Sequence, residues 1–411
     1  MLRFRPALIA FGLIAAGSAL GGCATVMAAP DSPAARQALN ARVFDTVWSE
    51  TRRRYYDPGL HGLDWDASRQ TYRPRALEAD DADELYAVLR DMLGELKDQH
   101  ANAQSPASVI NRELTRTRRA VLGLLMTPED DGVWKIEDIR EGSVADEARL
   151  ERGWRLMALD GESWRPDLIL TDGVPVVLTL RDETGGVRDL TLTPRLMDPV
   201  PLFTTSWLDH DTAVLRIEAF EPGLGDWLGA TLAQLPPETD LVLDLRGNPG
   251  GRLAEAEAVL SCFLPRGQAW AVQRFRGREP EVMHVDGDCG DRHTPFDNDL
   301  VVLVGPGSRS AAELTPAALQ EAGRAVVIGE QTPGVVLISQ EFRLPDGGKL
   351  SLSRADFLTH GGHRLEGNGV TPDILAPTSL DQRRAGVDPG LDAAIEALRM
   401  SAVAGTQVTR R

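Results

Sequence analysis

Residues 304–313 read Val304-Gly-Pro-Gly-Ser-Arg-Ser310-Ala-Ala-Glu313. The apolar run at 300–304 predicts a buried strand, and the residues after Ser310 predict a helix. The glycines between them would turn the chain and place Ser310 at the start of that helix. Serines at helix starts are usually caps. The same position can instead hold a nucleophilic hydroxyl, because the positive end of the helix dipole stabilises negative charge.

Apolar and amphipathic runs alternate through the rest of this half of the chain. The short apolar runs suited to buried strands lie at 213–217, 241–245, 300–304 and 325–328. A helical stripe between two of them consists of Leu253, Ala256, Val259, Leu260 and Phe263. A last amphipathic helix is expected over about residues 389–400. The alternation predicts an α/β domain over residues 198–400.

The first 22 residues have the features of a secretion signal. Two arginines precede an apolar run at 7–20, which is short for a membrane span. The Gly-Gly-Cys23 that follows resembles a bacterial lipoprotein processing site. Cys23 is therefore expected to anchor the protein on the periplasmic side of a membrane, with the outer membrane favoured by the residue after it. The alternative is an ordinary signal peptide. Residues 23–38 would form a flexible tether.

Composition excludes several classes of function. The chain has 411 residues and a net charge of −17, without a basic block, which argues against nucleic-acid binding. Its cysteines and histidines lack the spacing of metal ligands, so neither a metal nor another cofactor is expected. Cys262 and Cys289 could pair in an oxidising compartment or remain thiols.

Residues 39–112 predict an N-terminal helical domain. One helix is expected over 83–97, capped by Asp81 or Asp83, and it would end just before Asp98-Gln-His100. Residues 113–197 change character and resemble a PDZ domain. Such domains bind extended C-termini by strand addition, with backbone N–H groups on the terminal carboxylate. The resemblance gives that role to Leu122, Gly123 and Leu124.

Three further pieces could act with Ser310. Residues 244–251 read Asp-Leu-Arg-Gly-Asn-Pro-Gly-Gly, and the last two glycines could present N–H groups to an oxyanion; a tight turn is the alternative. His100 could be a general base, although most single histidines are structural or solvated. Glu366 precedes a glycine-rich turn and could orient a histidine, although such a glutamate is usually on the surface.

The order of these motifs resembles the tail-specific (C-terminal processing) serine peptidases over residues 40–400. The matching segments are Tyr-Tyr-Asp-Pro at 55–58, Asp-x-His at 98–100, residues 244–251, Ser-x-x-Glu at 310–313, Gly-Glu-x-Thr-x-Gly at 329–334 and Glu-Gly-x-Gly-Val-x-Pro-Asp at 366–373. One branch of this family uses a lysine 25 residues after the serine, where this chain has Val335. Of the three lysines in the chain, Lys349 is expected in a solvated turn.

The other branch, which includes the tricorn core protease and the retinoid-binding-protein-like peptidases, uses Ser–His–Glu. By this resemblance the catalytic residues would be Ser310, His100 and Glu366. The oxyanion would be held by the N–H groups of Ala311 and of Gly250 or Gly251. The implied fold is a crotonase/ClpP-like ββα catalytic domain with an inserted PDZ-like β domain and an N-terminal helical domain. The implied activity is endopeptidase cleavage of proteins or peptides.

Two departures favour a rival hypothesis, a catalytically inactive scaffold that binds peptides. Pro316 lies inside the helix after Ser310 and would kink it or make its first turn irregular, near Ala312. Arg309 is large where the family often has a small residue. A carrier of hydrophobic ligands has less support, because aromatic residues make up only 5% of the chain.

Overall fold

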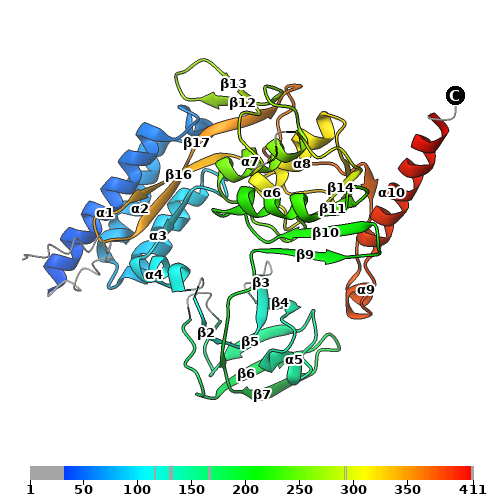
Figure 1. Cartoon of the computed structure of the whole chain (residues 1–411). Coiled ribbons are helices and arrows are strands. Elements are labelled where there is room, and N and C mark those ends of the chain that lie inside the picture. Colours follow the sequence, from blue (N-terminus) through cyan, green and yellow to red (C-terminus); the bar gives the residue numbers. More distant parts are fainter. Residues whose placement is uncertain are drawn as a thin grey trace, which may run out of the picture.

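The computed structural model describes residues 32–114, 117–128, 133–164, 168–290, 292 and 294–408 (Figure 1). Cys23 and the expected signal segment lie outside these residues. Helix α1 (Pro33–Arg54) begins at a proline, and the Ser32 hydroxyl caps it by accepting the Ala35 N–H at 3.2 Å. The expected tether is therefore wrong for residues 33–38, which are helical.

A six-stranded sheet forms the centre of the molecule, in the order β18-β15-β14-β11-β10-β9. Its strands are β9 (Phe203–Trp207), β10 (Thr212–Ile217), β11 (Asp240–Asp244), β14 (Leu300–Val304), β15 (Val326–Gly329) and β18 (Ile374–Leu375). Neighbouring strands are parallel except β9, which is antiparallel to β10. The predicted apolar runs correspond to β10, β11, β14 and β15, so the α/β prediction is confirmed.

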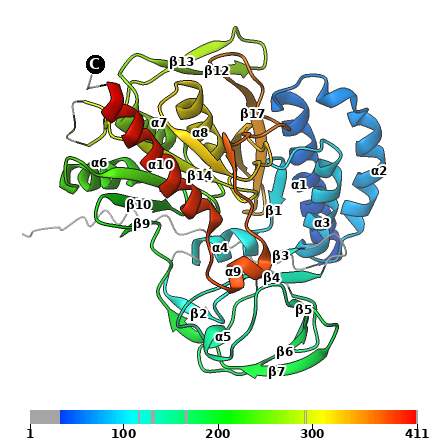
Figure 2. The same ribbon diagram turned by 90° about the vertical axis from the view of Figure 1, so that its right-hand side faces the viewer.

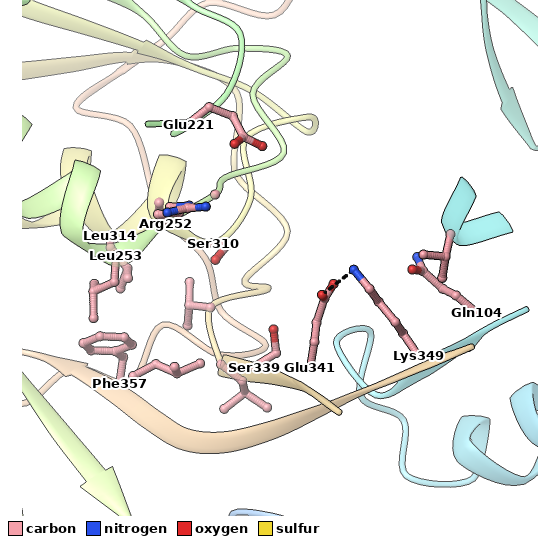
Figure 3. Close-up of a pocket in the computed structure, with 16 residues that line it drawn as sticks. Gln104, Glu221, Arg252, Leu253, Ser310, Leu314, Ser339, Glu341, Lys349 and Phe357 are labelled. Atoms are coloured by element: carbon pink, nitrogen blue, oxygen red, sulfur yellow. Dashed lines mark hydrogen bonds and ion pairs between the residues drawn. The ribbon is translucent and has the colours of Figure 1, made fainter. Parts of the chain in front are cut away.

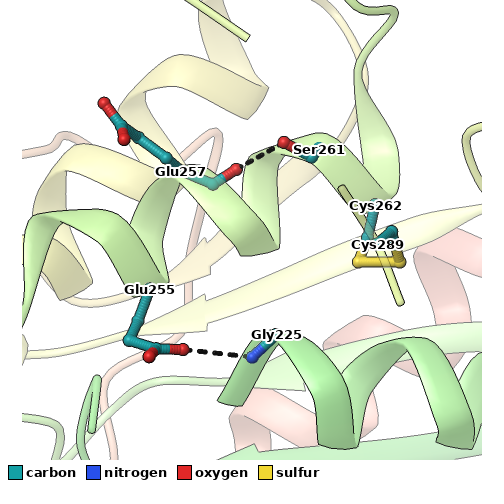
Figure 4. Close-up of a disulfide and its surroundings, with 6 residues drawn as sticks. All are labelled: Gly225, Glu255, Glu257, Ser261, Cys262 and Cys289. Carbon is teal, nitrogen blue, oxygen red and sulfur yellow. Dashed lines mark hydrogen bonds between the residues drawn. A yellow bond between two sulfur atoms is a disulfide. The ribbon is translucent and has the colours of Figure 1, made fainter. Parts of the chain in front are cut away.

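Alternate residues of these strands pack into two separate cores. One core lies under α6 (Leu224–Gln234), α7 (Leu253–Phe263) and α8 (Ala311–Glu321). The other lies under α10 (Pro389–Val408), on the opposite side of the sheet (Figure 2). In the first core, Cys262 at the end of α7 forms a disulfide with Cys289 (Figure 4). This bond decides between the two states of the cysteines that the sequence left open.

A second sheet, order β1-β17-β12-β13 with β16 also on β17, packs beside the first. It consists of β1 (Asn102–Gln104), β12 (Ala269–Phe275), β13 (Glu281–His284), β16 (Ile338–Arg343) and β17 (Lys349–Thr359). The N-terminal helices α1, α2 (Trp65–Glu78) and α3 (Ala82–Gly94) and the 3-10 turn η1 (Leu60–Gly62) bury their apolar side chains with Leu344, Leu350 and Leu352. The N-terminal region therefore shares its core with this sheet.

Helix α3 shows how His100 reaches the sheet. The Asp81 carboxylate caps the helix by accepting the Glu84 N–H at 2.9 Å. The helix ends at Gly94, before the predicted end at 97, and Lys97 has a left-handed backbone with φ of 52°. The chain then turns through His100 into β1, which pairs with β17.

Residues 119–197 form a lobe with its own core (Figure 1). Its antiparallel sheet has the order β3-β4-β5-β6-β7. The strands are β3 (Leu124–Pro128), β4 (Trp134–Ile139), β5 (Arg155–Leu159), β6 (Val176–Arg181) and β7 (Val187–Leu192). The first and last strands of the lobe, β2 (Arg119–Val121) and β8 (Arg195–Met197), pair with each other, and the lobe contains one helix, α5 (Val144–Glu147), among its described residues. Two further helices lie outside this range, α4 (Pro106–Leu114) and α9 (Leu380–Arg384). No helix in the described ranges is long and apolar enough to span a membrane.

Candidate active site

Ser310 lies at a sharp turn between β14 and α8, with φ of 54° and ψ of −119°. A capping serine normally has an extended backbone, and a non-glycine residue in this region is strained. Strain of this kind is typical of nucleophilic serines that project from a strand–turn–helix junction. Ser310 is half-buried and lines a cleft of about 600 Å³ (Figure 3). The local geometry therefore favours the nucleophile over the cap.

Glu313 fixes this strained turn. Its buried carboxylate accepts hydrogen bonds from the Thr332 hydroxyl (2.6 Å) and from the N–H groups of Gly334 (2.7 Å) and Val335 (2.8 Å). It also accepts the Ser310 N–H at 3.2 Å. Sequence reasoning gave Glu313 no role, although the Ser-x-x-Glu spacing places it in the first turn of the helix that follows Ser310.

Val335 occupies the position of the lysine found in the other branch of the family. It is buried, and its carbonyl accepts the Ser310 N–H at 2.7 Å. Lys349 begins β17 and not a turn, and its side chain, 35% exposed, lines the Ser310 cleft. Its Nζ bonds Glu341 Oε2 at 2.9 Å, across the cleft from Ser310 (Figure 3). The Lys349 amine is thus bonded to Glu341.

The two candidate oxyanion glycines differ in what their N–H groups do. Gly250 lies against the nucleophile, since a Cβ added to it would be 2.7 Å from the Ser310 Cβ. Its N–H is occupied, donating to Asn248 Oδ1 at 2.8 Å. Within the described part of the chain, the N–H groups of Gly251 and Ala311 have no acceptor. Gly251 and Ala311 both line the cleft, so Gly251 is the better candidate of the two glycines.

The loop that carries His100 contacts the residue before Ser310, through a hydrogen bond between segments 210 residues apart. Arg309, next to the nucleophile, donates from Nη1 to Gln99 Oε1 at 2.7 Å. This bond gives the large Arg309 side chain a structural role. Burial lowers the pKa of His100; the negative charge of Asp98 raises it, and the positive charge of Arg309 lowers it further. His100 is therefore in its basic, neutral form at neutral pH.

Glu366 does not hold His100 in this structure. Its Oε2 accepts the N–H groups of Val336 (2.8 Å) and Leu337 (3.2 Å), which line the cleft. His100 Nδ1 has no hydrogen-bond partner. Burial raises the pKa of Glu366, and the two N–H groups partly offset that effect. The expected Glu366–His100 pair is thus absent, and Glu366 supports the wall of the cleft.

Pro316 changes the first turn of α8 without ending the helix, which continues to Glu321. The N–H groups of Ala312 and Glu313 donate to the carbonyls three residues earlier, Arg309 (3.0 Å) and Ser310 (2.8 Å). Such bonds are typical of a tightened 3-10 turn. The Ser310 carbonyl also accepts the Leu314 N–H at 3.0 Å, an α-helical bond, so the tightening is confined to the start of the helix.

The cleft has an apolar end and a polar end. The apolar side chains on its wall are Leu253, Leu314, Val336, Leu337 and Phe357. The polar ones are Gln104, Glu221, Arg252, Glu341 and Lys349. No group of three or more His, Cys, Asp or Glu side chains in the described ranges is arranged to hold a metal ion.

The predicted carboxylate-binding residues lie in the 119–197 lobe, at the start of its edge strand β3. Gly123 has φ of 86°, and a Cβ there would lie 2.1 Å from the Ser143 Cβ, so only glycine fits. The carbonyls of Leu122 and Gly123 accept N–H groups from Ala145 (3.1 Å) and Arg140 (2.8 Å). Leu124 pairs with Ile139 of β4. Binding of a C-terminus by these residues remains a prediction.

Comparison with known proteins agrees with the architecture. Family models match peptidase family S41 over residues 211–376 and the tricorn protease C1 domain over residues 37–94. The carboxyl-terminal-processing protease of Synechocystis is 26% identical over 351 residues, covering 81% of this chain and 80% of that relative. These matches support a serine peptidase of the tail-specific protease family.

Two other known proteins are similar to this chain over most of its length. Tricorn protease homolog 1 of Streptomyces coelicolor is 28% identical over 396 residues, which are 89% of this chain but only 35% of that relative. The solved structure of a photosystem II D1 C-terminal processing protease shares the fold, with a TM-score of 0.61 and 22% identity. That match covers 82% of this chain and 93% of the solved one.

Proposed function

We propose that this protein is a serine endopeptidase in which Ser310 is the nucleophile and His100 the general base. His100 takes the Ser310 proton as the hydroxyl attacks a peptide carbonyl, and it later protonates the leaving amine. The N–H groups of Gly251 and Ala311 stabilise the oxyanion. The observation that carries this proposal is the strained Ser310 backbone beside two N–H groups that lack acceptors.

The resemblance assigns the third member of the triad to Glu366. The bonds from Glu366 to the Val336 and Leu337 N–H groups favour a different contribution, in which its carboxylate shapes the cleft wall. A substrate strand lying along that wall would depend on Glu366 for its position. The acidic partner of His100 is then a separate group.

The 119–197 lobe would act as a PDZ-like domain that captures substrate C-termini. Strand β3 is at the edge of its sheet, and Leu125 on that strand is 59% exposed. An edge strand of this kind can accept an extended peptide as a further strand. The catalytic domain would be of the crotonase/ClpP-like type, with this lobe inserted.

The protein would be held by a lipid on Cys23 at the periplasmic side of a bacterial membrane, with the outer membrane favoured. The buried Cys262–Cys289 disulfide supports an oxidising compartment. The variant that tests this anchor is Cys23→Ser, which should release the protein from the membrane fraction. If the Cys23→Ser protein stays with membranes as the wild type does, the lipid anchor is wrong.

The test of catalysis is labelling of the full chain by a fluorophosphonate probe, with turnover of unstructured protein measured in parallel. Wild type and Ser339→Ala, which alters another serine of the same cleft, should label. Ser310→Ala and His100→Ala should not, while circular dichroism shows all four folded. Absence of labelling and turnover in folded wild type would overturn the proposal and favour the peptide-binding scaffold.

A further inference from the structure

Unpaired polar atoms gather next to His100. The Tyr55 hydroxyl, Asp98 Oδ2 and His100 Nδ1 are buried, and among the described residues none of the three has a hydrogen-bond partner of good geometry. The Tyr55 hydroxyl and Asp98 are nevertheless close enough for a hydrogen bond between them to raise the Tyr55 pKa. Leaving buried polar atoms unpaired is unfavourable, so such groups in an enzyme call for an explanation. The absence of a Glu366–His100 bond leaves the histidine without the carboxylate that a serine peptidase triad requires.

Asp98 is placed to supply that carboxylate. Its side chain is only 1% exposed, and its Oδ1 accepts the backbone N–H of His100 at 2.8 Å. This short loop fixes the carboxylate beside the imidazole. Asp98 Oδ1 is 3.8 Å from His100 Nδ1, which is longer than a hydrogen bond. Catalytic hydrogen bonds are often long in the free enzyme and shorten when substrate binds.

Tyr55 lies close to the Asp98 carboxylate. It is fully buried, and its pKa is raised by burial and by the negative charge of Asp98. The phenol therefore stays protonated and can donate to Asp98. A donor of this kind keeps the carboxylate in place and leaves its other oxygen for His100.

We propose that Asp98, supported by Tyr55, is the positioning carboxylate that orients His100, and that Glu366 does not share this role. The proposal rests on the proposed function of Ser310 and His100. A small rotation of the ring lets Nδ1–H donate to Asp98 and turns Nε2 towards Ser310. When His100 takes the Ser310 proton, the Asp98 charge stabilises the imidazolium.

The charged groups around the pair are consistent with this assignment. Arg309 and Asp98 act on His100 with opposite signs, and Asp98 favours the protonated ring. The negative charge of Asp98 raises the pKa of Tyr55, Tyr56 and Glu366.

The decisive experiment is nitrogen-15 NMR of the histidine rings in the full chain, with His100 assigned by its loss in His100→Ala. In wild type, neutral His100 should carry its proton on Nδ1. Asp98→Asn keeps an oxygen for the His100 N–H but removes the charge, so it should lower the His100 pKa and abolish the Nδ1–H preference. Tyr55→Phe should give the same changes to a smaller degree.

Glu366→Gln is the matched control, since it also neutralises a half-buried carboxylate near the cleft and should leave the His100 signals unchanged. Fluorophosphonate labelling should fall about 10³-fold or more in Asp98→Asn, as for triad carboxylates elsewhere. The proposal is overturned if Asp98→Asn leaves the His100 ring unchanged or if Glu366→Gln changes it as much. The NMR readout does not depend on turnover, so it decides the role of Asp98 even if Ser310 proves inactive.

Discussion

The segment of Ser310 and the segment of His100, which are joined by the Arg309–Gln99 hydrogen bond, are held in opposite ways. Around Ser310, the Glu313 carboxylate accepts hydrogen bonds from four donors. One of these donors, the Ser310 N–H, also donates to the Val335 carbonyl. Around His100, buried atoms of Tyr55, Asp98 and the imidazole have no hydrogen-bond partner of good geometry among the described residues. The nucleophile segment is therefore organised before substrate arrives, whereas the base segment has hydrogen bonds still to make.

This difference follows from how each segment is built. The nucleophile segment is a continuous piece of one core, β14 followed by α8 and β15, and its bonds lie within residues 310–335. The base segment lies in the break between α3 and β1. Among the described residues, a side-chain bond from Arg309 to Gln99 ties it to the Ser310 segment. Pre-organisation is thus local for one half of the site and depends on tertiary contacts for the other.

The largest change to this comparison should come from Glu313→Gln. An amide keeps the shape but replaces one acceptor oxygen by a donor, which then faces the Thr332 hydroxyl or the Val335 N–H. Loss of hydrogen bonds to a buried charge should lower the free energy of unfolding by about 2–3 kcal/mol. The displaced turn should reduce the labelling rate of Ser310 by about 10²-fold.

Glu321→Gln is the matched control, because Glu321 lies at the other end of α8 and its carboxylate accepts from Thr359 and Gly361. It should leave the labelling rate within about twofold of wild type, since surface changes of this kind are small. Denaturant unfolding and labelling kinetics measure both effects. Equal rates in Glu313→Gln and wild type would show that the turn is not held by this carboxylate.

The sequence predicted the nucleophile segment better than the base segment. The apolar runs fixed the positions of β10, β11, β14 and β15, because buried parallel strands need continuous apolar residues. Order and spacing of motifs predicted Ser310 and the glycine turn together, and both line the same cleft. The choice of Gly251 over Gly250 needed the Asn248 side chain, whose direction no spacing reveals.

Longer-range pairings could not be predicted. Lys349 was expected in a polar turn, but it begins β17 opposite Arg343 of β16, and its Nζ reaches Glu341 on the same strand. Glu366 was expected on His100, and the fold brings it to the Val336 backbone instead. Both depend on which strands meet across the two sheets, and local sequence carries little information about that.

A smaller effect should come from Arg309→Gln, which breaks the one bond between the segments. It removes a positive charge that lowers the His100 pKa, so that pKa should rise. Labelling needs neutral His100, and the acid limb of its rate should therefore move to higher pH. Loss of the hydrogen bond to Gln99 should reduce the plateau rate by about tenfold or less. A hydrogen bond contributes about 1 kcal/mol, and a factor of ten in rate corresponds to roughly 1.4 kcal/mol.

Arg309→Lys separates the two contributions of Arg309, because it keeps the positive charge while losing the planar guanidinium. The acid limb should stay near its wild-type position in Arg309→Lys while the plateau rate falls. An unchanged limb in Arg309→Gln would mean that the Arg309 charge does not act on His100.

The smallest expected effect concerns the wild type itself, in the pH at which the labelling rate of Ser310 begins to fall on the acid side. His100 is buried and its pKa lies below the ordinary value of 6.5, so as pH falls His100 should remain neutral below that value. The labelling rate of Ser310 should accordingly be close to its plateau at pH 6.5 and fall only under more acid conditions. A limb above pH 6.5 would mean that Asp98 outweighs burial in the free enzyme, with the Nδ1–Asp98 bond already formed before substrate binds. The hydrogen bonds of His100, like those around Ser310, would then be formed before substrate binds, and the two segments would no longer differ in this respect.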